Sequence, residues 1–163
     1  MNSLETNIKR LGSELGFSSV GITSADDFTR DEHATIRRVK DGLMDGLPWF
    51  TEDRVRRANR PRELLPGARS VVSLAMSYQT GEPKLIGKGP HGRVARYAWG
   101  YDYHKVMKDR IKLFCNGLAK CTGRDVATRI FVDDGPMNDS ASAERSGIGW
   151  FGKNTNILNP TLG

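Results

Sequence analysis

The chain has 163 residues, of which 37% are hydrophobic and 27% charged, and its formal net charge at pH 7 is +6. This length is enough for one hydrophobic core and too short for two, so we expect a single domain over residues 1–163. The sequence contains no run of about 18 apolar residues that could span a membrane, and its N-terminus lacks the basic-then-apolar order of a secretory signal. Together with the low cysteine content, these features predict a cytoplasmic protein.

The first third of the sequence predicts two helices around a short strand. Apolar residues recur at helical spacing over residues 4–15, with Ser3 as a possible N-cap and Gly16 as the stop signal. Residues 19–23 then have the composition of a short strand. Apolar residues within 36–43 mark a second amphipathic helix, which is predicted to end near residues 46–48.

The middle of the sequence combines a charged helix, a strand and a long loop. The charged helical stretch follows Trp49 and Phe50 and runs toward Pro61. The mostly apolar run 70–78 is the clearest strand, and we expect it to be central in the sheet. Residues 80–93 are rich in glycine and proline and form the longest loop candidate.

The last third predicts a helix, a strand and a second helix. Asp102 is the expected N-cap of a helix whose apolar stripe starts at Tyr103. Residues 127–132 have the β-branched and aromatic composition of a buried strand, and residues 140–146 form a helix that Gly147 ends. This order of elements predicts an α+β fold in which helices cover a small mixed sheet.

An acidic pair and a glycine-rich loop follow the last predicted strand. Residues 132–136 read Val-Asp-Asp-Gly-Pro, at the strand end where sheets of this kind present reactive groups. Residues 147–154 read Gly-Ile-Gly-Trp-Phe-Gly-Lys-Asn, which nearly matches two nucleotide-binding loops. Both of those loops follow a strand directly, whereas a helix precedes this one. A helix stop followed by a tight packed turn is therefore the alternative interpretation.

The positive charge favours a polyanionic partner, because each phosphate that a protein neutralises contributes to binding by counterion release. The alternative is that these basic segments are solvated surface. The basic residues concentrate in two groups, which are Arg54, Arg56, Arg57, Arg60, Arg62 and Arg69, then Lys84, Lys88, His91, Arg93 and Arg96.

The two cysteines do not suit a metal centre. Cys115 and Cys121 are six residues apart without further cysteines, so they match neither a zinc site nor an iron–sulfur cluster. We expect free thiols, with Cys115 buried on the apolar stripe of its helix.

Several blocks resemble the epoxyqueuosine reductases, in the right order across nearly the whole chain. The blocks are residues 15–22, 64–72, 95–104, 132–136 and 143–154. The resemblance implies a cobalamin-dependent iron–sulfur enzyme that removes the epoxide oxygen from epoxyqueuosine in tRNA. It also implies a cobalamin-binding domain related to the nitroreductase-like fold. Members of this family continue into a module with two cysteine-rich cluster motifs, so the resemblance implies that this chain is the N-terminal domain of a longer monomeric reductase, not competent alone, whose clusters lie outside it.

The resemblance implies roles for particular residues. The family's catalytic aspartate directly follows the strand's last valine, which here is Asp133, and we expect it to act as a general acid. Burial or the neighbouring Asp134 would raise its pKa. Which of the two carboxyls is the acid stays open, and a plain turn with an Asx cap is the alternative.

The cofactor residues are predicted in the same way. The resemblance suggests that Lys153, Asn154 and the backbone around Ile157 bind the corrin amides and phosphate, with Arg57 or Arg60 from the basic segment, and that Tyr97 lines the substrate pocket. None of the three histidines lies in a known cobalamin-ligating motif, and His104 is expected in the first turn of a helix, so no metal ligand is assigned in this chain.

Two other functions fit the same sequence. One is a related corrinoid reductase, similar to a reductive dehalogenase, that acts on a small molecule. The other is a non-catalytic module that uses only its basic surface to bind RNA. Steeply salt-dependent binding of tRNA would favour the epoxyqueuosine reductase over the small-molecule reductase. Binding of a corrinoid would exclude the plain RNA-binding module.

Overall fold

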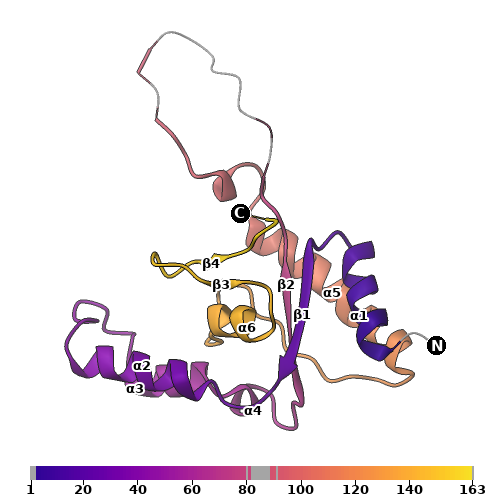
Figure 1. Cartoon of the computed structure of the whole chain (residues 1–163), viewed down its shortest axis with the longest axis horizontal. Helices are drawn as coiled ribbons and strands as arrows, with labels where there is room; N and C mark the ends of the chain where they lie inside the picture. Colours follow the sequence, from indigo (N-terminus) through magenta and orange to yellow (C-terminus); the bar gives the residue numbers. More distant parts are fainter. Residues whose placement is uncertain (1–2, 80, 82–88, 91, 163) are drawn as a thin grey trace.

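A two-stranded antiparallel sheet forms the centre of the fold. The computed structural model describes residues 3–79, 81, 89–90 and 92–162. Strand β1 (Ser19–Ser24) pairs with β2 (Ser70–Ala75), from Ser19 opposite Ala75 to Ser24 opposite Ser70. Helices α1 (Leu4–Glu14) and α5 (Tyr103–Thr122) lie on one side of this sheet, and α6 (Asp139–Arg145) contacts it from the other (Figure 1).

The main core lies between the sheet and helices α1 and α5. Its buried residues are Phe17, Phe114 and Leu118, and the Phe17 and Phe114 rings meet edge to face at 6.3 Å. Val20 of β1 faces this core, whereas a side chain at the next position, Gly21, would collide with Ser146 beyond the C-terminal end of α6. The alternation of side chains along a strand thus sends consecutive residues of β1 to opposite faces.

Three helices extend away from the sheet. Helices α2 (Thr29–Lys40) and α3 (Glu52–Ala58) lie side by side, followed by the short α4 (Pro61–Leu64) (Figure 1). Phe28, Val55 and Leu64 are buried at their base. Helix α3 begins at the N-cap Thr51, whose side chain accepts from the Arg54 amide.

The C-terminal part is built around α6. Asn138 caps the start of this helix through its side chain, and Gly147 lies just beyond its end with φ +78°, a conformation that glycine adopts without steric cost. A small hairpin follows, in which β3 (Trp150–Phe151) pairs antiparallel with β4 (Ile157–Leu158). A short 3₁₀ turn, η1 (Arg96–Ala98), precedes α5.

The α+β class and most predicted elements are confirmed. The caps predicted at Ser3 and Asp102 both accept from backbone amides, and Gly123 ends α5 in the left-handed conformation. The sheets are smaller than predicted, since the described part of the chain forms two antiparallel strand pairs in place of one mixed sheet. Helix α2 ends at Lys40, before the predicted residues 46–48.

Two strand predictions differ from the structure. Residues 127–132 form no strand; residues 127–129 are exposed, and only Val132 is buried. In the described residues β2 has β1 as its one neighbour, so it is not central. A β-branched composition favours a strand only where another strand can pair with it, and that partner is a matter of tertiary structure.

Other predictions have mixed outcomes. Both cysteines are free thiols, as predicted, but Cys115 is half-buried where full burial was expected. Most of the predicted loop 80–93 lies outside the described residues, and so do Lys84, Lys88 and His91. Among the helices that the structure describes, none is both long enough and apolar enough to cross a membrane.

Candidate active site

The acidic pair lies against the first turns of α5. Asp102 accepts from the His104 amide at 3.0 Å and begins the helix, which directs Tyr103 toward the loop that carries the two aspartates. The Tyr103 hydroxyl donates to Asp133 Oδ2 at 2.5 Å. Lys108, five residues further along the same helix, forms an ion pair with Asp134 Oδ2. One helix therefore contacts each of the neighbouring carboxylates with a different donor.

Asp133 has an unusual backbone conformation. Its φ is +53°, in the left-handed region that residues other than glycine seldom adopt, although aspartate tolerates it better than most. Its amide donates to Asp139 Oδ2 in the first turn of α6, at 3.3 Å. Non-glycine residues in this region often mark functional sites, where surrounding contacts hold the conformation in place.

Asp134 has the surroundings of a structural carboxylate. Its Oδ1 accepts at 3.2 Å from the amide of Val132, two residues earlier in the chain. The hydrogen bond from Lys108, and then the bond from Val132, hold the pKa of Asp134 below its ordinary value. Asp134 is thus charged at neutral pH, and each of its two carboxylate oxygens has a partner.

Two neighbours of Asp133 have raised pKa values. The hydrogen bond to Asp133, followed by desolvation, raises the pKa of Tyr103 to about 12, so the phenol stays protonated. Desolvation of its carboxyl, with smaller contributions from Asp133 and Asp134, raises the pKa of Asp139 to about 6, although the residue keeps exposed surface. A carboxyl that titrates near neutral pH beside a candidate acid is typical of catalytic sites.

Two neighbouring rings contact the ring of Tyr103. Tyr97 meets the Tyr103 ring edge to face at 6.0 Å, and His104 stacks on it at 4.0 Å. His104 is held in turn by Asp102, at 2.8 Å from its Nδ1. Tyr97 therefore contacts Tyr103, the residue that bonds to Asp133, and His104 lies in the first turn of a helix as predicted.

The predicted residues of the glycine-rich stretch lie in the hairpin. Lys153 and Asn154 form its turn, and Ile157 pairs with Phe151. The hairpin packs against α6, whose first residue contacts the Asp133 amide. Within the described residues no hydrogen bond or ion pair links Lys153 or Asn154 to the Asp133 loop.

The two predicted arginines differ sharply in their surroundings. Arg60 binds both oxygens of the buried Glu32, at 3.0 and 2.9 Å, and also Glu63 at 3.2 Å. These bonds raise the pKa of the guanidinium and occupy it in the fold. Arg57 is exposed and has no ion pair with any residue that the structure describes.

Much of the arginine-rich segment is engaged in internal ion pairs. Arg56 binds Glu52 and Asp53, and Arg62 binds Asp26. Arg54 instead lies over the exposed ring of Trp49 at 4.9 Å. The predicted basic surface is consequently smaller than the sequence count suggests, since only part of its charge is available to a partner.

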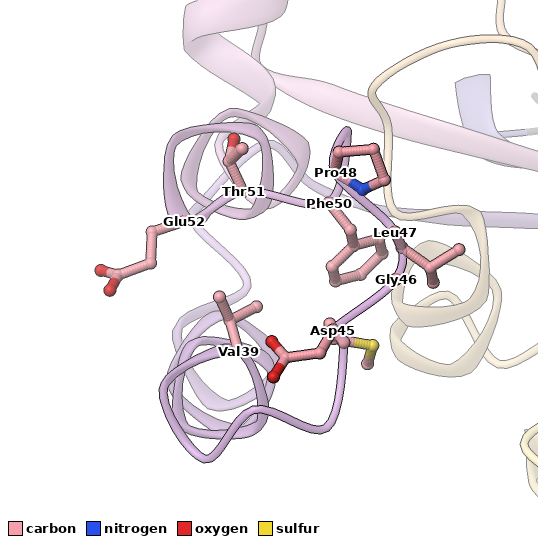
Figure 2. Close-up of a pocket in the computed structure, with 9 residues that line it drawn as sticks. Val39, Asp45, Gly46, Leu47, Pro48, Phe50, Thr51 and Glu52 are labelled. Carbon is pink, nitrogen blue, oxygen red and sulfur yellow. The ribbon is translucent and has the colours of Figure 1, made fainter.

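Two open depressions lie away from Asp133. One, of about 460 Å³, is formed where α2 leads into α3, with the Phe50 ring turned into it and Glu52 pointing outward (Figure 2). The other, of about 350 Å³, lies beside Phe28, Arg30 and Arg145. Neither depression is lined by a predicted site residue. The ionisable side chains around Asp133 therefore identify the candidate site better than these depressions do. The described residues also contain no group of His, Cys, Asp and Glu side chains arranged to hold a metal ion.

Comparison with known proteins gives a consistent answer. A family model described as Epoxyqueuosine reductase QueG, DUF1730, matches residues 57–134. An epoxyqueuosine reductase of Leadbetterella byssophila is 37% identical over the whole chain, and that of Salmonella typhimurium is 38% identical. The solved epoxyqueuosine reductase of Streptococcus thermophilus superposes on 98% of the chain with a TM-score of 0.81 and 30% identity. The chain is a relative of the epoxyqueuosine reductases.

The chain spans about half the length of the curated epoxyqueuosine reductases that it matches. It covers 52% of the Leadbetterella protein and 42% of the Salmonella protein. An epoxyqueuosine reductase solved with an epoxyqueuosine-modified stem loop of tyrosine tRNA matches with a TM-score of 0.80, and the chain covers 42% of it. The Bacillus subtilis enzyme, solved with its aspartate-bearing catalytic loop swung out of the active site, matches with a TM-score of 0.76 and 28% identity.

Three residues of the epoxyqueuosine reductase-like site are missed by sequence reasoning. The sequence pattern places Tyr103 in the apolar stripe of its helix and gives no role to Lys108 or Asp139. Tyr103 lies at the solvent-facing start of α5, outside the group of residues that packs on the core. Its position directly after a helix cap is a signal for a first-turn side chain that projects beyond the helix, but the sequence does not specify which loop it meets.

Proposed function

We propose that this chain is the N-terminal, cobalamin-binding domain of a longer epoxyqueuosine reductase. The complete, monomeric protein would remove the epoxide oxygen of epoxyqueuosine in tRNA, with electrons from iron–sulfur clusters held outside these 163 residues. The observation that carries the proposal is the pair of neighbouring aspartates, one tied to Lys108 and the other held by Tyr103 in a left-handed turn. The resemblance of sequence and fold to epoxyqueuosine reductases supports it.

Asp133 is the proposed general acid. Removing the epoxide oxygen as water consumes two electrons and two protons, and breaking a C–O bond leaves negative charge on that oxygen. A positioned proton donor lowers this barrier and typically contributes about 100-fold to 10,000-fold in rate. Asp134 is unsuited to the role, because Lys108 keeps its pKa low and its oxygens are already engaged. Asp133 is exposed toward solvent and retains Oδ1 for the substrate.

The chemistry of the hairpin fits a large cofactor with a flat face and polar edges. Trp150 and Phe151 expose aromatic surface, and the exposed Lys153 has no ion pair within the described chain. Lys153, Asn154 and the backbone around Ile157 would hold the corrin amides and phosphate, with Arg57 as a further cation. Arg60 is a weaker candidate, since Glu32 and Glu63 occupy it. Cobalamin, when bound, supplies a strongly reducing metal centre in a domain that we propose to be related to the nitroreductase-like fold.

tRNA is the proposed macromolecular partner. A solved relative binds an epoxyqueuosine-modified tRNA stem loop, and the net charge of +6 favours a polyanion. Exposed cations remain available at Arg57 and Arg69, and the Trp49 ring with Arg54 above it offers a stacking surface of the kind that single-stranded bases use. A reductase that turns over a small molecule and ignores tRNA and salt would contradict this part of the proposal.

A titration of cobalamin followed by visible absorbance tests the proposal directly. We expect a saturable spectral change together with a raised melting temperature, because a ligand that binds only the folded state stabilises it. The complete protein should then convert epoxyqueuosine-modified tRNA when supplied with a reductant. Absence of a spectral change in the complete, folded protein would refute the cobalamin assignment.

A further inference from the structure

The Asp133 carboxyl depends on side-chain contacts for its position. Residues 132–138 belong to no helix or strand, and the Asp133 backbone lies in the left-handed region, so regular secondary structure does not fix the side chain. The loop also has a neighbouring carboxylate that could exchange places with Asp133 at the site. Within the loop the Val132 amide holds Asp134, so the position of the Asp133 carboxyl depends on groups outside the loop.

Tyr103 is the best-fixed group that touches Asp133. It extends from the first turn of α5, a helix of 20 residues whose Met107, Ile111 and Phe114 pack in the core. Its ring meets the Tyr97 ring edge to face at 6.0 Å and stacks with the His104 ring at 4.0 Å. Because two aromatic contacts restrain the ring, they favour the position in which the hydroxyl donates to Asp133 Oδ2 at 2.5 Å.

We infer that Tyr103 is a positioning residue for the proposed acid, and that its hydroxyl fixes Asp133 Oδ2 so that Oδ1 carries the proton toward the substrate. The inference rests on the proposed function and adds a residue to it. Lys108 completes the arrangement, since it holds Asp134 away from the same position. The phenol acts as a hydrogen-bond donor and not as the acid itself, because its pKa is about 12.

Tyr103→Phe in the complete protein tests this role. The variant keeps the ring and its two aromatic contacts and removes only the hydroxyl, so folding and the melting temperature should be preserved. Loss of alignment at the reacting atoms commonly costs about 100-fold, and we expect kcat for epoxyqueuosine-modified tRNA to fall by about 10-fold to 100-fold. KM should stay within about 2-fold. Tyr101→Phe is the matched control, because Tyr101 is 92% exposed, and it should leave kcat unchanged.

The same substitution in an Asp133→Asn background separates positioning from other effects. If Tyr103 acts through Asp133, the two losses are not additive, and Tyr103→Phe lowers the residual kcat of Asp133→Asn by less than about 2-fold. Hydrogen exchange of the peptide that spans residues 130–138 should be faster in Tyr103→Phe and unchanged in Tyr101→Phe. An unchanged kcat in Tyr103→Phe, or a full additional loss in the double variant, would overturn the inference. Wild-type protein without turnover would instead refute the proposed function.

Discussion

Asp139 gives the sharpest prediction about stability. Its pKa is about 6 in the folded protein against an ordinary 3.8, so the folded state binds the proton more tightly than the unfolded chain does. Folding stability should therefore fall as the pH rises from about 3.8 to about 6, and the deficit is complete above that range. Asp139→Asn removes the charge but keeps an oxygen that can accept from the Asp133 amide. The variant should be more stable than wild type at neutral pH.

The size of this effect follows from the pKa difference. The change from 3.8 to about 6 corresponds to about 3 kcal/mol. Asp139 keeps exposed surface, and solvent screening reduces that figure, so we expect a gain of about 1–2 kcal/mol for Asp139→Asn above pH 7. For a domain of this size, each kcal/mol raises the melting temperature by roughly 2–4 °C.

Thermal unfolding of both proteins between pH 4 and pH 8, followed by circular dichroism, measures the effect. The difference in melting temperature should be near zero at pH 4 and largest above pH 7. Asp134→Asn is the control of opposite sign, because Lys108 lowers the pKa of Asp134 and so makes the charged form stabilising. That variant should lose stability by a similar amount across pH 4–8, because the charged carboxylate stops contributing only below its ordinary pKa of 3.8. A gain for Asp139→Asn that is equal at pH 4 and pH 8 would refute the electrostatic reasoning.

Three further predictions concern the proposed reaction and its ligands. Asp133→Asn should lower turnover by about 100-fold to 10,000-fold while cobalamin still binds, as measured by visible absorbance. Lys153→Ala should weaken cobalamin about 10-fold in the same titration, whereas Arg60→Ala should chiefly lower the melting temperature, because it leaves the buried Glu32 unpaired. Arg57→Gln should reduce the salt dependence of tRNA binding by about one phosphate contact, with Arg10→Gln on the distant α1 as the unaffected control.

The helices could be predicted from sequence because their signals are local. Ser3 and Asp102 cap α1 and α5 as expected, and an N-cap acts on amides only two or three residues away. Residues 127–132 show the opposite case. Their composition favours a strand, yet pairing depends on a neighbour that only the tertiary structure supplies, and in the described residues no strand forms there.

The candidate site was likewise predictable from the sequence only in part. The place of the two aspartates after an apolar run could single out the pair, whereas only the resemblance selects Asp133 within it and Tyr97. Tyr103 and Asp139 gain their roles from contacts that loop and helix packing create, across 30 and 6 residues respectively. The sequence likewise could not show that Glu32, 28 residues away, occupies Arg60, and an arginine's availability to a ligand depends on such pairings.

Helix α6 connects the two halves of the candidate site. Its first residue accepts from the Asp133 amide, and its end leads through Gly147 into the hairpin that carries Lys153. The helix is itself fixed by its last residue, Arg145, which donates to the carbonyls of the final residue of β1 and of two residues just beyond it. The Arg145 guanidinium also stacks on Phe28 at 3.6 Å, and Glu144 binds Arg30.

This anchoring has a consequence for how the site works. Asp139, which accepts from the Asp133 amide, and the base of the hairpin lie at the two ends of α6. One short helix therefore links the proposed acid to the proposed cofactor surface. The contacts to Tyr103 and Lys108 come from α5, on the opposite side of the sheet from α6. Residues 133 and 134 thus bond to both helices, and the left-handed conformation of Asp133 lets one short loop reach α5 and α6 together.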